Sequence, residues 1–203
     1  MISVIDYGVA NLGSIKNMLG RIGVEAILAS SPGQVVDSDK IILPGVGSFQ
    51  HGMAELNKRG LIEPLRQQAK EGVPILGICL GMQLLGNGSD EGPGKEGLGL
   101  IDARCERLSP PAGSGLKVPH MGWCQLAIRR DAPIFDSLPP ESRYYFVHSF
   151  HLVCNKQDDV LATAEYGQQF TAAVQSGTVL GVQFHPEKSH RFGMALLRNF
   201  ANQ

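Results

Sequence analysis

The residue of this chain best placed for covalent chemistry is Cys79, in the segment Gly77-Ile78-Cys79-Leu80-Gly81. This order follows the small–x–nucleophile–x–small pattern of a nucleophile elbow, with cysteine in place of serine. Glycines on both sides let a strand turn sharply into a helix, because a side chain there would crowd the turn. The sulfur would then lie at a helix N-terminus, where free N–H groups and the helix dipole favour a thiolate. A cysteine in such a turn can also be a small buried packing residue, so other segments must decide.

A second segment, Gly181–Lys188, has His185 directly after an apolar run and Glu187 two residues later. Pro186 stiffens the link, so the imidazole and the carboxylate can face each other across one short turn. A cysteine nucleophile needs a base to accept its proton, and that base needs an acid to hold its orientation. Cys79, His185 and Glu187 supply these three groups. Taken alone, the second segment also fits a surface histidine beside a solvated glutamate.

A third segment, Pro44-Gly45-Val46-Gly47, ends another short apolar run. Its two glycines leave the backbone free to aim an N–H group at a developing oxyanion, and a second N–H can come from Leu80. A loop of this kind can also hold a phosphate, but it lacks the Walker lysine and does not continue as GxGxxG. Two further segments, Val118–Trp123 and Tyr144–Phe150, mix aromatic residues with histidine and on their own predict core and turn.

The elements that must position these groups alternate between strand and helix patterns in the first half of the chain. The expected elements are a strand at Ile2–Ile5, a helix at Leu12–Ile22 capped by Asn11, a strand at Val24–Leu28, a loop at Ser30–Gly33, a strand at Lys40–Leu43, helices at Phe49–Lys58 and Leu61–Glu71, and the elbow strand with its helix. This alternation predicts an α/β fold with a mostly parallel central sheet and helices on both faces.

The second half of the chain has a different pattern, with short β-like runs between turns after a glycine- and acid-rich loop at Asn87–Gly99. The expected strands are at Leu100–Leu108, Gly122–Arg129, Tyr144–Val147, Val160–Ala164, Phe170–Val174 and Val179–Val182. They extend the sheet or form a small antiparallel layer, and a final helix at Arg191–Ala201 packs on the sheet. At 203 residues we expect a single domain covering 1–203.

Composition excludes several classes of function. The formal net charge is −1 and no run of like charges occurs, so nothing indicates a nucleic acid or an anionic membrane as partner. The longest apolar runs have the length of strands, and the N-terminus is typical of a strand rather than a signal peptide. Four cysteines without CxxC spacing predict neither a disulfide framework nor a zinc site, and they fit a reducing cytoplasm. No metal or organic cofactor is indicated.

Together these motifs closely resemble the class I glutamine amidotransferases, which have a Cys-His-Glu triad on a flavodoxin-like three-layer fold. Within that family they are most similar to the glutaminase subunits of imidazole glycerol phosphate synthase. The resemblance covers nearly the whole chain. It is carried by Asp6-Tyr7-Gly8 and by the segments PGVG, GICLGMQLL, VPHMGW, YYFVHSF and GVQFHPEKS, whose first residues are Pro44, Gly77, Val118, Tyr144 and Gly181.

The resemblance implies a role for each matching residue. Cys79 attacks the side-chain amide of glutamine, His185 transfers the proton to departing ammonia, and Glu187 orients His185. The N–H groups of Val46 and Leu80 form the oxyanion hole. The residues that would hold glutamine are Gly47, Gln83, Glu91 (through the α-ammonium group), Ser149 and Phe150.

The resemblance also implies a partner, a (β/α)8-barrel cyclase subunit that forms a heterodimer with this chain and receives ammonia through a tunnel. The cyclase makes imidazole glycerol phosphate and the purine precursor AICAR in histidine biosynthesis. Residues matching the docking face are Asn11, Trp123, Tyr145 and Lys188. Two positions depart from the family pattern: Ala10 and Cys124 stand where glycine and asparagine are usual. The alternative is a paralogue that donates ammonia to a sugar amidotransferase in surface-polysaccharide biosynthesis.

Two other classes of protein remain open from the residues alone. A cysteine peptidase on a related fold would share the elbow but would lack the pocket formed by Gln83 and Glu91. A non-catalytic binding subunit would not need Cys79, His185 and Glu187 together, so the intact set argues against it.

Overall fold

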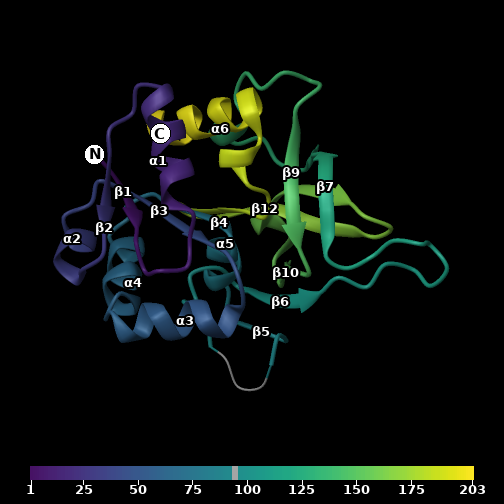
Figure 1. The fold of residues 1–203 in the computed structure, drawn as a ribbon, viewed down its shortest axis with the longest axis horizontal. Coiled ribbons are helices and arrows are strands. Elements are labelled where there is room, and N and C mark those ends of the chain that lie inside the picture. The colour runs from purple at the N-terminus through teal and green to yellow at the C-terminus, as the bar shows by residue number, and fades with distance from the viewer. Residues whose placement is uncertain (93–95) are drawn as a thin grey trace.

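The computed structural model describes residues 1–92 and 96–203, so part of the expected loop at Asn87–Gly99 lies outside the described residues. Its centre is an eight-stranded sheet (Figure 1). The strands lie in the order β2 (Ala26–Ala29), β1 (Ile2–Ile5), β3 (Lys40–Gly45), β4 (Ile75–Cys79), β13 (Val179–Val182), β12 (Gln169–Ser176), β11 (Val160–Glu165) and β8 (Ala127–Ile128). The first five are parallel and the last three pair antiparallel.

Helices cover both faces of this sheet. Figure 1 shows α1 (Leu12–Arg21) and α6 (His190–Asn202) on one face and α3 (Phe49–Lys58) and α4 (Ile62–Lys70) on the other. Side chains along β3 alternate between the two cores: Ile41 and Leu43 pack with the α3–α4 side, and Ile42 packs with the α1–α6 side. A strand buried on both faces explains the uninterrupted apolar run. The prediction of a mostly parallel α/β sheet is confirmed.

Two smaller sheets lie beside the central one. One contains β10 (Phe150–Cys154), β6 (Ala103–Arg107) and β5 (Gly88–Ser89), and the other pairs β7 (His120–Gln125) with β9 (Arg143–His148). Three short 3₁₀ turns complete the described elements: η1 (Pro133–Phe135), η2 (Gln157–Asp159) and η3 (Pro186–Lys188). The small antiparallel extension expected from the sequence is therefore present, although β10 was not among the predicted strands.

The loop predicted at Ser30–Gly33 is wrong, because helix α2 (Pro32–Val36) begins there. Ser31 is its N-cap and forms a capping box with Gln34, whose side-chain oxygen accepts from the Ser31 N–H at 3.2 Å. Pro32 is favourable at the first helical position, since its missing N–H group is not needed there. The preceding strand begins two residues later and ends one residue later than predicted, because β2 pairs in register with all four residues of β1.

The register of the central strands brings the three motif segments together. Gly45 at the end of β3 pairs with Cys79 at the end of β4, and Ile78 pairs with Val182 at the end of β13. Because parallel strands end at the same edge, the segments that follow β3, β4 and β13 meet there. The longest described helix, α6, has 13 residues, and no helix in the described ranges is long and apolar enough to cross a membrane.

Candidate active site

Cys79 is the last residue of β4 and the N-cap of α5 (Leu80–Leu84), and its backbone is strained, with φ 55° and ψ −110°. The glycines on either side make this turn possible. A Cβ atom on Gly77 would lie 2.7 Å from the Met82 amide nitrogen, and one on Gly81 would overlap the carbonyl oxygen of Leu43. The strand can therefore turn directly into the helix only with glycine at both positions, and the turn holds the sulfur at the helix N-terminus.

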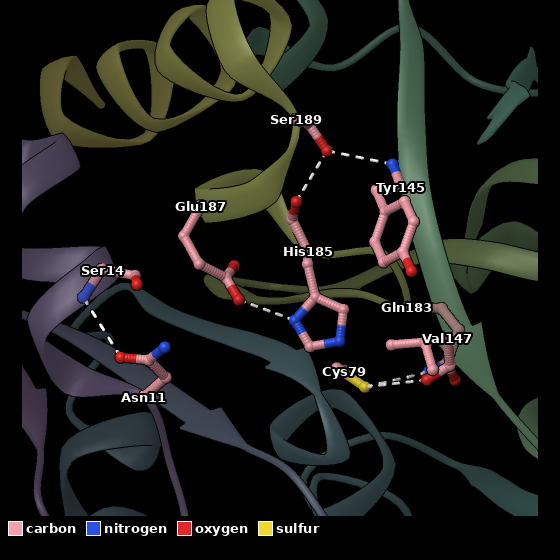
Figure 2. Close-up of polar contacts among 9 residues, drawn as sticks. All are labelled: Asn11, Ser14, Cys79, Tyr145, Val147, Gln183, His185, Glu187 and Ser189. Carbon is pink, nitrogen blue, oxygen red and sulfur yellow. Dashed lines mark hydrogen bonds and ion pairs between the residues drawn. The ribbon is translucent and has the colours of Figure 1, made fainter. Parts of the chain in front are cut away.

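His185 and Glu187 lie beside this sulfur (Figure 2). His185 is the N-cap of η3, the 3₁₀ turn that follows β13, and Glu187 lies within that turn. His185 Nδ1 lies 2.7 Å from Glu187 Oε1. Their side chains are only 2% and 4% exposed. Glu187 therefore fixes one ring nitrogen, while Nε2 faces Cys79 in Figure 2 and has no hydrogen-bond partner among the described residues.

The surroundings of His185 favour its protonated form. Burial lowers the pKa of this imidazole, but the neighbouring Cys79 and Glu187 outweigh burial and raise the pKa to about 9. The hydrogen bond that is formed is the one to Glu187. Cys79 contributes through the nearness of its sulfur to the ring, without a hydrogen bond to Nε2 among the described residues. These neighbours favour an imidazolium at His185.

Ser189 holds the backbone of His185, and no sequence pattern indicates this role. Its hydroxyl donates to the His185 carbonyl at 2.6 Å and accepts from the Tyr145 N–H at 3.0 Å (Figure 2). The His185 N–H in turn donates to the Tyr145 carbonyl at 2.9 Å. These three bonds tie the segment after β13 to strand β9.

A cavity of about 410 Å³ opens beside the sulfur, a size suited to a small ligand. It contains every residue that the sequence proposed for glutamine binding and for the oxyanion hole. Its lining includes Cys79, His185, Val46, Leu80, Gly47, Gln83, Glu91, Ser149 and Phe150. Three additional residues line it that the sequence did not assign to a site: Pro119, Val147 and His148.

The polar side chains of this cavity are held in fixed orientations. Gln83 donates from Nε2 to the Phe150 carbonyl at 3.0 Å. Glu91 accepts the Phe49 N–H, at the start of α3, through Oε2 at 2.7 Å. A helix N-terminus favours a carboxylate, so this contact stabilises the negative charge at Glu91. The carboxylate can then offer its other oxygen to a cationic group in the cavity.

The loop after β3 does not present its expected donor, the Val46 N–H, to the cavity. The Val46 N–H donates to the Val9 carbonyl at 2.8 Å, so it points away from an oxyanion at the sulfur. Gly47 has φ +96°, a conformation that suits glycine. The Leu80 N–H begins α5 and has no intrahelical acceptor. Turning the peptide between Gly45 and Val46 would free the Val46 N–H from Val9 and add the second donor.

Of the residues that match the docking face, Lys188 lines the cavity, and Tyr145 lies between Lys188 and Trp123. Trp123 on β7 is paired with Tyr145 on β9, and their rings lie 5.8 Å apart. The Lys188 ammonium lies 5.9 Å from the Tyr145 ring centre, and Lys188 also lines the cavity. Asn11 is exposed and caps α1 by accepting the Ser14 N–H at 3.4 Å, on the far side of Glu187 in Figure 2.

The histidines of the two aromatic segments form a buried pair. His120 Nδ1 lies 3.1 Å from His148 Nε2, and His148 Nδ1 lies 2.8 Å from the Phe150 carbonyl. Burial lowers the pKa of His148 to about 3, so the ring is neutral. The two histidines hold the Phe150 backbone in place. Their burial agrees with the core positions predicted for the two aromatic segments.

Sequence comparisons identify the family and several relatives. The family model described as Glutamine amidotransferase class-I matches residues 3–203. The chain is 47% identical to a Methanococcus maripaludis protein named imidazole glycerol phosphate synthase subunit HisH 2, with 100% of each chain covered. It is also 47% identical to the Pseudomonas aeruginosa protein of the same name, with 98% of each covered. A Moorella thermoacetica protein named imidazole glycerol phosphate synthase subunit HisH is 45% identical, covering 98% of this chain and 93% of the relative.

Solved structures match the fold over nearly the full chain. One described as a glutamine amidotransferase has a TM-score of 0.74 at 22% identity, covering 99% of this chain and 97% of the other. The structure of PurLQS from Thermotoga maritima has a TM-score of 0.74 at 21% identity with the same coverage. At this identity the likeness concerns the fold alone.

Proposed function

This chain belongs to the class-I glutamine amidotransferase family, and from that premise we propose that it is the glutaminase subunit of an imidazole glycerol phosphate synthase. It is an enzyme that uses glutamine. The observation that supports this subunit type most strongly is the 47% identity over the whole of both chains to a protein of that name. We further propose that residues 1–203 form one domain and that the chain works in the cytoplasm.

The proposed reaction begins when His185 Nε2 accepts the Cys79 thiol proton. The sulfur attacks the side-chain amide carbon of glutamine, and a tetrahedral intermediate forms. His185 then donates the proton to the amide nitrogen, the C–N bond breaks, and ammonia leaves a thioester on Cys79. Water, deprotonated by His185, cleaves the thioester to glutamate and regenerates the thiol. Glu187 keeps the ring oriented throughout, which the 2.7 Å contact to Nδ1 supports.

Substrate positioning in this proposal rests on the polar groups of the cavity. Glu91 binds the α-ammonium group of glutamine with the oxygen not used by Phe49. Gln83, Gly47 and the backbone of Ser149 and Phe150 hold the rest of the molecule. The oxyanion can accept a hydrogen bond from the Leu80 N–H at once. It can accept one from the Val46 N–H only after that group has left the Val9 carbonyl. The resting chain is therefore expected to turn over slowly.

The proposed partner is a (β/α)8-barrel cyclase that forms a heterodimer with this chain and consumes the ammonia in histidine biosynthesis. A closed path between the subunits would favour the transfer, because ammonia released into neutral water is largely protonated and ammonium is a poor nucleophile. Asn11, Trp123, Tyr145 and Lys188 would contact the cyclase. Docking beside Tyr145 can reach His185 through the backbone bonds that join them.

The test is glutamate release by the purified chain alone, with the cyclase, and with the cyclase plus its nucleotide substrate. We expect slow release alone and strong stimulation by the complete pair, with none from a Cys79→Ser control. Glutamine hydrolysis without any stimulation by the pair would contradict the subunit assignment and leave the triad standing. Hydrolysis of peptides rather than glutamine would contradict both.

A second candidate function is favoured by Ala10 and Cys124, which depart from the family pattern near the proposed docking face. Cys124 lies on β7 beside Trp123, where a different partner surface would select different side chains. In that case the same glutaminase would supply ammonia to a sugar amidotransferase. Stimulation by such an enzyme, and not by the histidine-pathway cyclase, would support it.

A further inference from the structure

The side chain of Gln183 is fully buried between the nucleophile and the glutamine pocket, two residues before His185. Its amide nitrogen Nε2 lies 3.8 Å from the Cys79 sulfur, within reach of a hydrogen bond to sulfur (Figure 2). Its oxygen Oε1 accepts from Gln83 Nε2 at 3.1 Å. A buried amide must satisfy both ends, so these contacts decide which end faces the sulfur.

The orientation of Gln183 follows from one backbone carbonyl. The Phe150 oxygen can only accept, so the Gln83 amide must turn Nε2 toward it, at 3.0 Å. The second N–H of Gln83 Nε2 points to Gln183, so Gln183 must present its acceptor, Oε1, to it. That leaves the N–H groups of Gln183 for the sulfur. A chain of three residues thus places a neutral donor, and not an acceptor, at Cys79.

The sulfur has a second neighbour with the opposite preference. Cys79 Sγ lies 3.9 Å from the Val147 carbonyl, which can accept from a thiol but repels a thiolate. When the proton leaves for His185, the contact with Val147 loses its donor. The contact with Gln183 becomes a hydrogen bond to a charged group, which is stronger than one between neutral groups. The two neighbours therefore favour different protonation states of the same atom.

We propose that Gln183 is a further catalytic residue, which stabilises the Cys79 sulfur by hydrogen bonding whenever that sulfur carries negative charge. This occurs twice in the reaction: when the thiol proton passes to His185, and when the C–S bond of the thioester breaks and the electron pair returns to sulfur. The inference rests on Cys79 being the nucleophile of the proposed function. It does not depend on the partner or on the fate of ammonia.

The test measures the ionisation of Cys79 without glutamine or partner. The alkylation rate of Cys79 by iodoacetamide is followed against pH, with the Cys79 peptide quantified separately from those of Cys105, Cys124 and Cys154. Gln183→Met keeps the length of the side chain and removes the donor. We expect the pH at which this variant is alkylated at half its maximal rate to lie about one unit above that of the parent chain. Alkylation of Cys79 near neutrality is then about tenfold slower than in the parent, and the two rates are the same at high pH. Gln169→Met, at an exposed position of β12, is the matched control.

Gln183→Asn provides a second variant in case methionine disturbs folding. Its amide is one methylene shorter and cannot reach the sulfur, while the site stays polar. We expect the same shift in the alkylation profile. We also expect kcat for glutamine to fall by a factor about ten times larger than the factor by which KM changes. A folded variant with an unchanged alkylation profile would overturn the proposal. A shifted profile in a chain that does not hydrolyse glutamine even with the cyclase would support the hydrogen bond from Gln183 to the Cys79 sulfur and contradict the proposed function.

Discussion

The backbone N–H of His185 donates to the carbonyl oxygen of Tyr145 at 2.9 Å, which joins the segment after β13 to strand β9. Ser189 completes this connection by bonding the remaining backbone groups of both residues. Tyr145 also faces Trp123 and Lys188 near the cavity rim. A contact made at this surface therefore bears directly on the position of the imidazole.

Ser189→Ala removes both hydroxyl bonds and leaves the Tyr145 N–H without a partner, while the His185 carbonyl keeps only the Lys188 N–H at 3.1 Å. We expect a loss of unfolding free energy of about 1–3 kcal/mol, the usual cost of leaving buried polar groups unpaired. We also expect a roughly tenfold fall in kcat with little change in KM, because the base moves and the glutamine pocket does not. Urea unfolding and glutaminase kinetics measure these effects. Ser114→Ala, at an exposed position, should leave both unchanged.

Cys79→Ser should abolish glutamine-dependent synthesis in the complex and keep ammonia-dependent synthesis, because the cyclase performs the second step. Both residues have the same backbone requirements, so the elbow should persist. Product formation with glutamine or with an ammonium salt measures the two activities. Loss of both activities in a complex that still assembles would contradict this division of labour. In the parent chain, the electrophile diazo-oxo-norleucine should label Cys79 and spare Cys124.

Glu187→Gln should destabilise the chain in a pH-dependent manner. Glu187 helps to raise the pKa of His185 from 6.5 to about 9, so the stability contributed by the imidazolium is fully present below pH 6.5 and is lost as pH rises through about 9. The variant should therefore lose on the order of 1–2 kcal/mol at pH 6 and much less at pH 10. Urea unfolding at both pH values measures this difference.

The control for that experiment is Glu141→Gln, which breaks an exposed ion pair with Arg191. Its cost should stay below about 1 kcal/mol, because surface pairs are screened by water. An equal cost of Glu187→Gln at pH 6 and pH 10 would show that its carboxylate does not stabilise the imidazolium.

His185→Ala should reduce glutaminase activity more than Glu187→Gln does. Alanine removes the group that moves the proton, whereas glutamine at position 187 leaves the base in place and weakens only its orientation and charge. Glutamate release under stimulated conditions compares the two variants. A larger loss for Glu187→Gln would mean that the carboxylate acts on the substrate itself.

Gly81→Ala should disrupt the elbow, since the new Cβ would overlap the Leu43 carbonyl oxygen on the adjacent strand. We expect a loss of about 3 kcal/mol or more, because the obstructing atom belongs to a central strand and cannot move aside. Gly20→Ala is the matched control: it lies in α1 with open space around it. That change should be neutral or stabilise the chain by up to about 1 kcal/mol. Thermal unfolding of both variants gives the comparison.

The sequence alone predicted the parts of this protein that depend on local patterns. Helix α3 has the predicted bounds of Phe49–Lys58, and β1 and β13 lie where the apolar runs placed them. The elbow glycines were also readable, because their spacing around Cys79 reports a steric need of the turn itself. The predicted loop at Ser30–Gly33 overlooks helix α2, although Ser31, Pro32 and the following Gln34 are ordinary helix-start signals.

Only the tertiary structure decided the contacts that tune the site. Gln83 and Gln183 are 100 residues apart in sequence, and the Cys79–Gln183 contact spans 104. Such pairs depend on the register of β4 and β13 and on the need of buried amides for partners, which no local periodicity records. The same holds for Ser189 and for the Val46 N–H, whose acceptor on Val9 is set by how two loops pack. The sequence indicates the type of reaction, because reactive groups need particular residue types. The fold decides how strongly the surrounding hydrogen bonds act on those groups, because hydrogen bonds need particular distances.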